Sequence, residues 1–78
     1  MTREEIIKQL TPICKELFKN PDLIVTETLD ATQVEGWSSL TFMQLLEKVE
    51  ELFHFKFKVM ELIEIKNIGD LVDIVMQH

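Results

Sequence analysis

The sequence contains few of the residues that form disulfide bonds, metal centres and membrane spans. Its 78 residues include one cysteine, two glycines, two prolines, one tryptophan and no tyrosine. A single thiol, Cys14, excludes an internal disulfide and a cysteine-rich zinc site. No apolar run approaches the roughly 18 residues that a membrane span needs, and residues 1–5 lack the apolar core of a signal peptide. We therefore expect one cytoplasmic domain covering residues 1–78.

Basic residues are also scarce. The chain has 8 Lys+Arg against 14 Asp+Glu, a net charge of −6. Because DNA and RNA binding needs a basic stripe, nucleic acid is not an expected partner, whereas proteins with basic surfaces are. With 46% hydrophobic residues, the composition is that of a folded chain rather than a disordered one.

Residues 2–18 have the pattern of an amphipathic helix. Thr2 with Glu5 three residues later has the spacing of a capping box. Pro12 removes one helical hydrogen bond and predicts a kink or break near Thr11. Apolar side chains recur at intervals of three and four residues, as one face of a helix requires: Ile6, Ile7, Leu10, Ile13, Cys14, Leu17 and Phe18.

Residues 19–37 lose this periodicity and predict a long loop, in which a short helical turn remains possible. Asn20, Pro21 and Asp22 form a turn signal that ends the first helix. A loop of this length is uncommon in a compact domain and is usually functional. Scattered apolar residues are expected to hold it against the core: Leu23, Ile24, Val25, Leu29 and Val34.

A second helix is predicted over residues 39–53, and it has two distinct faces. At about 100° per residue, six apolar residues fall in one core-facing arc about 120° wide: Phe42, Leu45, Leu46, Val49, Leu52 and Phe53. The opposite face begins at Ser39 and sets two apolar side chains among carboxylates: Leu40, Met43, Glu47, Glu50 and Glu51. Periodicity alone leaves three interpretations of Leu40 and Met43: a contact surface, ordinary exposed residues, or residues covered by the loop.

The remaining segments complete an all-helical pattern. Residues 53–58 alternate like a strand but have no partner strand, so we expect an extended link with Phe55 and Phe57 turned inward. A short helix is predicted near residues 60–65, and a last helix starts with Asn67 as its N-cap. Apolar stripes on helices bury against one another, which predicts an all-α fold: a small four-helix bundle, three main helices and one short one, with a long first loop.

Chemically reactive groups are few. His54 and His78 lack a paired ligand or catalytic partner, and Cys14 lies on an apolar stripe, so no catalytic or metal site is expected. Ser38 and Ser39 stand at the start of the second helix, where a serine usually caps the helix. A reachable serine there could also carry a phosphate group, which free backbone N–H groups and the helix dipole would favour.

Three stretches resemble the acyl carrier proteins, the phosphopantetheine-binding carrier domains. Residues 36–46, GWSSLTFMQLL, resemble the family's Gly-x-Asp-Ser-Leu motif and the helix that follows it. Residues 50–57, EELFHFKF, are similar to its Glu-Glu-x-Phe-Gly-Ile-x-Ile segment. Residues 65–75, IKNIGDLVDIV, resemble its C-terminal segment. The similarity covers nearly the whole chain in the family's order.

The resemblance implies a carrier rather than an enzyme. Ser39 would receive covalent 4′-phosphopantetheine from coenzyme A, through a separate phosphopantetheinyl transferase. The thiol of that arm would hold acyl groups as thioesters for fatty acid, polyketide or related biosynthetic enzymes. In this family the helix after the serine is the docking surface, which assigns Leu40, Met43, Glu47, Glu50 and Glu51 to contacts with basic patches on loading, transfer or condensing enzymes. A monomer is expected.

The chain departs from the family pattern at several positions. Ser38 replaces the aspartate before the modified serine, which leaves two alternatives: modification of Ser38, or an unmodified carrier-like module that only binds proteins. His54 replaces a glycine and Lys58 a proline, changes expected to alter a turn and little else. The third segment is unusually apolar, so part of it is either deeply packed or exposed.

Overall fold

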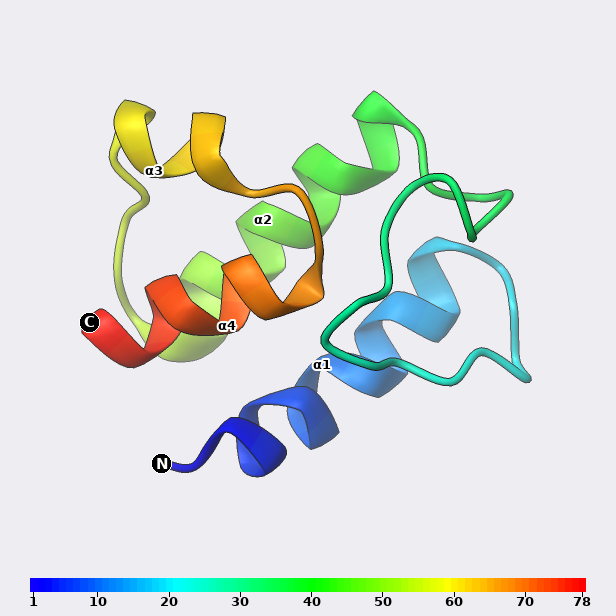
Figure 1. Ribbon diagram of the computed structural model, residues 1–78, viewed down its shortest axis with the longest axis horizontal. Helices are drawn as coiled ribbons and strands as arrows, with labels where there is room; N and C mark the ends of the chain where they lie inside the picture. The colour runs from blue at the N-terminus through cyan, green and yellow to red at the C-terminus, as the bar shows by residue number, and fades with distance from the viewer.

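The computed structural model describes all residues 1–78 and contains four helices and no strand (Figure 1). They are α1 (Arg3–Leu17), α2 (Ser39–Phe53), α3 (Val59–Glu64) and α4 (Ile68–Gln77). The predicted all-α bundle of three main helices and one short helix is confirmed. None of these helices has both the length and the apolar character needed to cross a membrane.

The core joins α1, α2, α4 and the first loop. Its centre is fully excluded from solvent, with Leu10, Leu45, Val49 and Leu71 at 0% exposure. No polar or charged residue is buried among them. Cys14 belongs to this cluster, and burial raises the pKa of its thiol to about 12. The thiol therefore acts as a small hydrophobic group, as the sequence predicted.

Helix α1 has the predicted capping box but not the predicted break. The Glu5 N–H donates to Thr2 Oγ1 at 3.1 Å, and the Thr2 N–H donates to Glu5 Oε1 at 3.0 Å. The sequence predicted a kink or a break near Thr11. The helix runs from Arg3 to Leu17 with Pro12 inside it, so the break is wrong, and the kink stays a prediction. Proline has no N–H to donate, so one carbonyl in the preceding turn has no helical partner. Because Pro12 is exposed, that carbonyl lies on the solvent side of the helix.

The first loop lies against the core as predicted and contains turns but no helix. Two backbone hydrogen bonds tie it to the start of α4: Ile68 N–H to the Leu29 carbonyl at 3.0 Å, and Gly69 N–H to the Glu27 carbonyl at 2.8 Å. Ile24 was expected to help hold the loop, but its side chain is 77% exposed. The buried residues on either side of it, Leu23 and Val25, hold that part of the loop instead.

The link from α2 to α3 is extended and turns its phenylalanines inward, as predicted. Phe55 and Phe57 are half-buried with ring centroids 4.8 Å apart, and Phe55 also stacks on His78 at 4.4 Å. Helix α3, by contrast, has no buried residue. Its apolar side chains are exposed rather than deeply packed, which settles the alternative that the sequence left open.

Candidate functional site

The turn that leads into α2 is fixed against the end of α1. The Trp37 ring stacks between Phe18 and Phe42, at centroid distances of 5.2 Å and 5.6 Å. Gly36 approaches the chain so closely that a Cβ atom there would lie 2.3 Å from the Phe18 carbonyl oxygen. Only glycine fits this position without moving the backbone. The start of α2 is therefore held in place by packing rather than left free.

Ser38 is the N-cap of α2. Its Oγ accepts a hydrogen bond from the Thr41 N–H at 3.2 Å, and Thr41 Oγ1 accepts one from the Ser38 N–H at 2.8 Å. The Thr41 hydroxyl also donates to the Gly36 carbonyl at 2.8 Å. The role of Thr41 was not predicted, although its place three residues after Ser38 has the spacing of a capping box. The Ser38 hydroxyl is therefore used by the fold.

Ser39, the first residue of α2, differs from Ser38. Its side chain is exposed and takes part in no hydrogen bond of the structure. The backbone N–H groups of Ser39 and Leu40 also lack an acceptor, as expected in the first turn of a helix. A phosphate ester on the Ser39 oxygen would meet these donors and the positive end of the helix dipole, and would break no bond of the fold. The residues present fit such a group.

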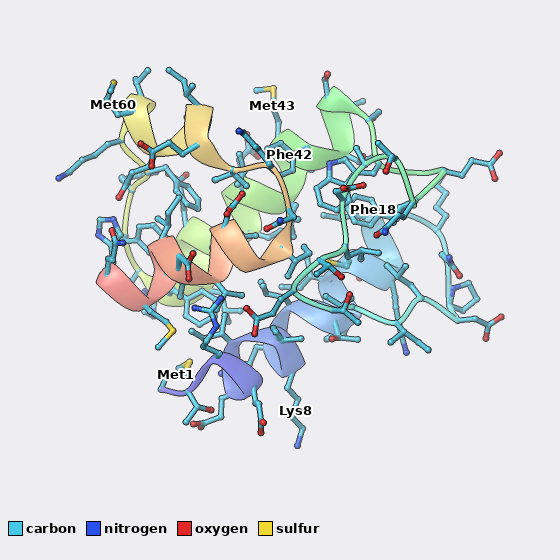
Figure 2. All side chains as sticks on the ribbon, viewed as in Figure 1. Met1, Lys8, Phe18, Phe42, Met43 and Met60 are labelled. Carbon is cyan, nitrogen blue, oxygen red and sulfur yellow. The ribbon has the colours of Figure 1, made fainter.

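The outer face of α2 continues from Ser39. Leu40 is 66% exposed and Met43 is 61% exposed, so the first loop does not cover them. Figure 2 shows Met43 projecting away from the bundle, while Phe42 lies inside it near Phe18. Two large apolar side chains therefore stand in solvent directly after the free serine.

The three glutamates predicted for this face are placed differently from one another. Glu47 is exposed and borders a hollow of about 170 Å³ between α2 and α3. Glu50 borders the same hollow, but its carboxylate accepts the Phe57 N–H at 2.8 Å. Glu51 is exposed one turn after Glu47, where it borders another hollow with Glu50 and His54. The structure thus places Glu47 beside Met43, gives Glu50 a structural bond as well, and puts Glu50 and Glu51 on the border of a second hollow.

The opposite end of α2 brings one correction. Leu52 was predicted to lie in the core, but it is 39% exposed. It stands at the edge of the apolar arc in the last turn, where it borders a hollow together with Ile13.

Neither histidine lies near Ser39. His54 caps the far end of α2, 15 residues away, a distance of about 22 Å along the helix. His78 Nε2 lies 3.0 Å from Glu61 Oε2 and its ring stacks on Phe55. The structure has no group of three His, Cys, Asp or Glu residues that could hold a metal ion. Neither histidine is therefore placed to act as a general base for the exposed hydroxyl of Ser39.

Comparison with known proteins identifies the family. Residues 8–75 match the family model described as "Phosphopantetheine attachment site". This chain belongs to that family of carrier domains. It is 32% identical over 75 residues to an acyl carrier protein of Coprothermobacter proteolyticus, with 96% of this chain and 92% of that protein covered. It is also similar to the solution structure of a holo acyl carrier protein from Geobacter metallireducens, with a TM-score of 0.83, 34% identity, and coverage of 91% and 82% of the two chains.

Membership makes the chain a carrier domain whose cofactor is covalently attached 4′-phosphopantetheine. The resemblance seen in the sequence is thereby confirmed, and so is the bundle fold. The substitution of Ser38 for the aspartate of the motif that the chain resembles keeps a side-chain cap on α2, because Ser38 Oγ accepts the Thr41 N–H. It does remove a negative charge, and the first turn of α2 contains no acidic residue.

Proposed function

We propose that this chain is an acyl carrier protein whose attachment residue is Ser39. The observation that supports this assignment is the division of roles between two adjacent serines. Ser38 uses its hydroxyl to cap α2, whereas the Ser39 hydroxyl is exposed and unbonded. Modification of Ser38 would disrupt the hydrogen bond that caps the helix, whereas modification of Ser39 would disrupt no hydrogen bond of the fold.

The chain's own contribution is to hold one oxygen where another protein can reach it. Packing of Trp37 between two phenylalanines fixes the turn, and the cap formed by Ser38 and Thr41 fixes the first turn of α2. The bound phosphopantetheine supplies a thiol that holds acyl groups as thioesters. We assign those acyl groups to fatty acid, polyketide or related biosynthesis. We also assign to a separate phosphopantetheinyl transferase the step that moves the arm from coenzyme A onto the chain.

The surface beside Ser39 suits transient docking of such enzymes. Leu40 and Met43 offer apolar contacts directly after the attachment residue, and Glu47 adds a carboxylate beside Met43. Basic groups on a partner would be attracted to this side, which speeds encounter, while a small contact area keeps the complex short-lived. Glu50 and Glu51 extend the acidic surface toward the far end of α2.

Intact mass after incubation with coenzyme A, magnesium and a broad-specificity phosphopantetheinyl transferase tests the assignment. We expect one phosphopantetheine on the wild-type chain and on Ser38→Ala, and none on Ser39→Ala. Modification that survives Ser39→Ala and disappears in Ser38→Ala would move the site to Ser38. A wild-type chain that is never modified, in the reaction or when purified from its own host, would favour the unmodified interaction module.

A further inference from the structure

Arg3, the only arginine of the chain, joins three separate parts of the fold. From the start of α1, its guanidinium donates to the Glu27 carboxylate of the first loop, through Nε at 3.0 Å and also through Nη2. It reaches α4 at the Asp73 carboxylate, at the Gly69 carbonyl, which is 3.2 Å from Nη2, and at the Met76 sulfur, which is 3.7 Å from Nη1. Its five N–H groups therefore all have acceptors, and none of those acceptors lies in α1.

The loop segment that this side chain holds, residues 26–30, has few other attachments to the bundle. Leu29 is its only buried residue. Two backbone hydrogen bonds connect the segment to the start of α4: one from the Ile68 N–H to the Leu29 carbonyl, and one from the Gly69 N–H to the Glu27 carbonyl. Figure 1 shows this part of the loop passing the start of α4. A segment with so little buried surface is of the kind that opens locally while the rest of a protein stays folded.

Two parts of the first loop are held in different ways. The end that leads into α2 is held by packing, with the Trp37 ring stacked between two phenylalanines. Residues 26–30 are held by charged groups that water can reach, since the side chains of Arg3, Glu27 and Asp73 are 34%, 48% and 54% exposed. Salt screens the attraction between exposed charges, whereas it does not screen the packing of aromatic rings. Ionic strength should therefore act on residues 26–30 and not on the end of the loop.

We propose that Arg3 is an electrostatic latch, which holds residues 26–30 against α4 and whose release lets this segment open while the helices stay folded. Opening would uncover Leu29 and the part of the core that this side chain covers. The latch makes the closure of the loop sensitive to ionic strength, because it consists of two partly exposed ion pairs. This inference goes beyond the proposed function and holds whichever serine is modified.

Salt should affect this segment and the whole chain in opposite directions. The net charge of −6 produces repulsion across the folded chain, and salt screens that repulsion. At residues 26–30 the balance is reversed, because there salt screens the attraction between Arg3 and two carboxylates. Loosening of this segment by salt is therefore a property of the latch and not of the overall charge.

Native-state hydrogen exchange measured by NMR tests the proposal, with the Ile68 and Gly69 amides as probes. These N–H groups lie in the first turn of α4, where a helix offers no acceptor, so the loop carbonyls alone protect them from exchange. We expect both amides to exchange faster than those of the buried part of α2, at rates that low urea concentrations leave unchanged, because local opening exposes little surface. Salt at about 1 M should accelerate their exchange. Arg3→Met should accelerate it about tenfold at low salt, as loss of two partly exposed ion pairs implies, and should remove the response to salt.

Lys8→Met is the matched control, because it removes the same charge from an exposed residue of α1 that takes part in no ion pair of the structure (Figure 2). It should leave the exchange of both probe amides unchanged, and the fluorescence of Trp37 should be the same in the wild type and in both variants. Probe amides that respond to urea as steeply as those of α2 would overturn the proposal, because the loop would then open only with the whole bundle. It would also be overturned by a salt response that persists in Arg3→Met, by an equal acceleration in Lys8→Met, or by a shift of Trp37 emission in Arg3→Met.

Discussion

Truncation of two neighbouring serines is expected to have different effects on stability. Ser38→Ala removes the oxygen that accepts the Thr41 N–H at 3.2 Å, so a donor at the start of α2 loses its partner. Loss of a serine N-cap costs about 1 kcal/mol, within a range of about 0.5–2. In a domain of this size, 1 kcal/mol corresponds to a fall of roughly 4–8 °C in the melting temperature. Ser39→Ala removes an exposed, unbonded hydroxyl and should change stability by less than about 0.5 kcal/mol.

Thermal and urea unfolding followed by circular dichroism measures both variants, and Ser38→Asp supplies the control. Aspartate keeps a side-chain oxygen for the cap and adds a negative charge at the positive end of the α2 dipole. That charge should raise stability by about 0.3–1 kcal/mol over the wild type. Equal losses for Ser38→Ala and Ser39→Ala, or a larger loss for Ser39→Ala, would refute the assignment of the cap and with it the argument that Ser39 is the free serine.

Three further predictions concern the rest of the molecule. Val49→Ala truncates a fully buried side chain and should lower the free energy of unfolding by about 2 kcal/mol. Met43→Ala on the outer face should change it by less than about 0.5 kcal/mol. Equal urea midpoints for the two variants would mean that the two faces of α2 are misassigned. His54 ends α2 at φ 60°, so His54→Gly should raise stability by about 0.5–1 kcal/mol, and a lowered melting temperature would contradict this reasoning. Hydrogen bonds from backbone N–H groups lower the pKa of Glu5 and Glu61 below about 4.5. The stability that these carboxylates contribute is therefore present above that pH and is lost as the pH falls through the lowered pKa values. Unfolding free energies that do not decline from about pH 6 to about pH 3 would disagree with this prediction.

Local chemistry in the sequence was enough to predict most of the fold. The bounds of α2 and the caps at Thr2 and Asn67 follow from apolar periodicity and from side chains that satisfy the first N–H groups of a helix. The errors occurred where tertiary packing decides. Pro12 did not break α1 because it lies on the solvent side, and Leu52 is partly exposed because it stands at the edge of the apolar arc.

The candidate site was predicted only in part, for a related reason. Sequence spacing identified two serines at the start of α2 but could not tell which one caps the helix, because that depends on the backbone conformation at Ser38 and on the reciprocal bond from Thr41. Periodicity likewise put Glu50 on the outer face without revealing that the link beyond α2 returns to its carboxylate. The exposure of α3 also depends on packing, since a six-residue helix has too little periodicity to indicate which side is covered.

The most direct test of Ser39 as the attachment residue is to locate the modification in the protein purified from its own host. Tandem mass spectrometry of the peptide that spans residues 36–46 can separate the two serines, because fragment ions that break between them differ in mass. We expect phosphopantetheine on Ser39 and an unmodified Ser38. The arm on Ser38, or a peptide that carries no arm in the native protein, would contradict this assignment.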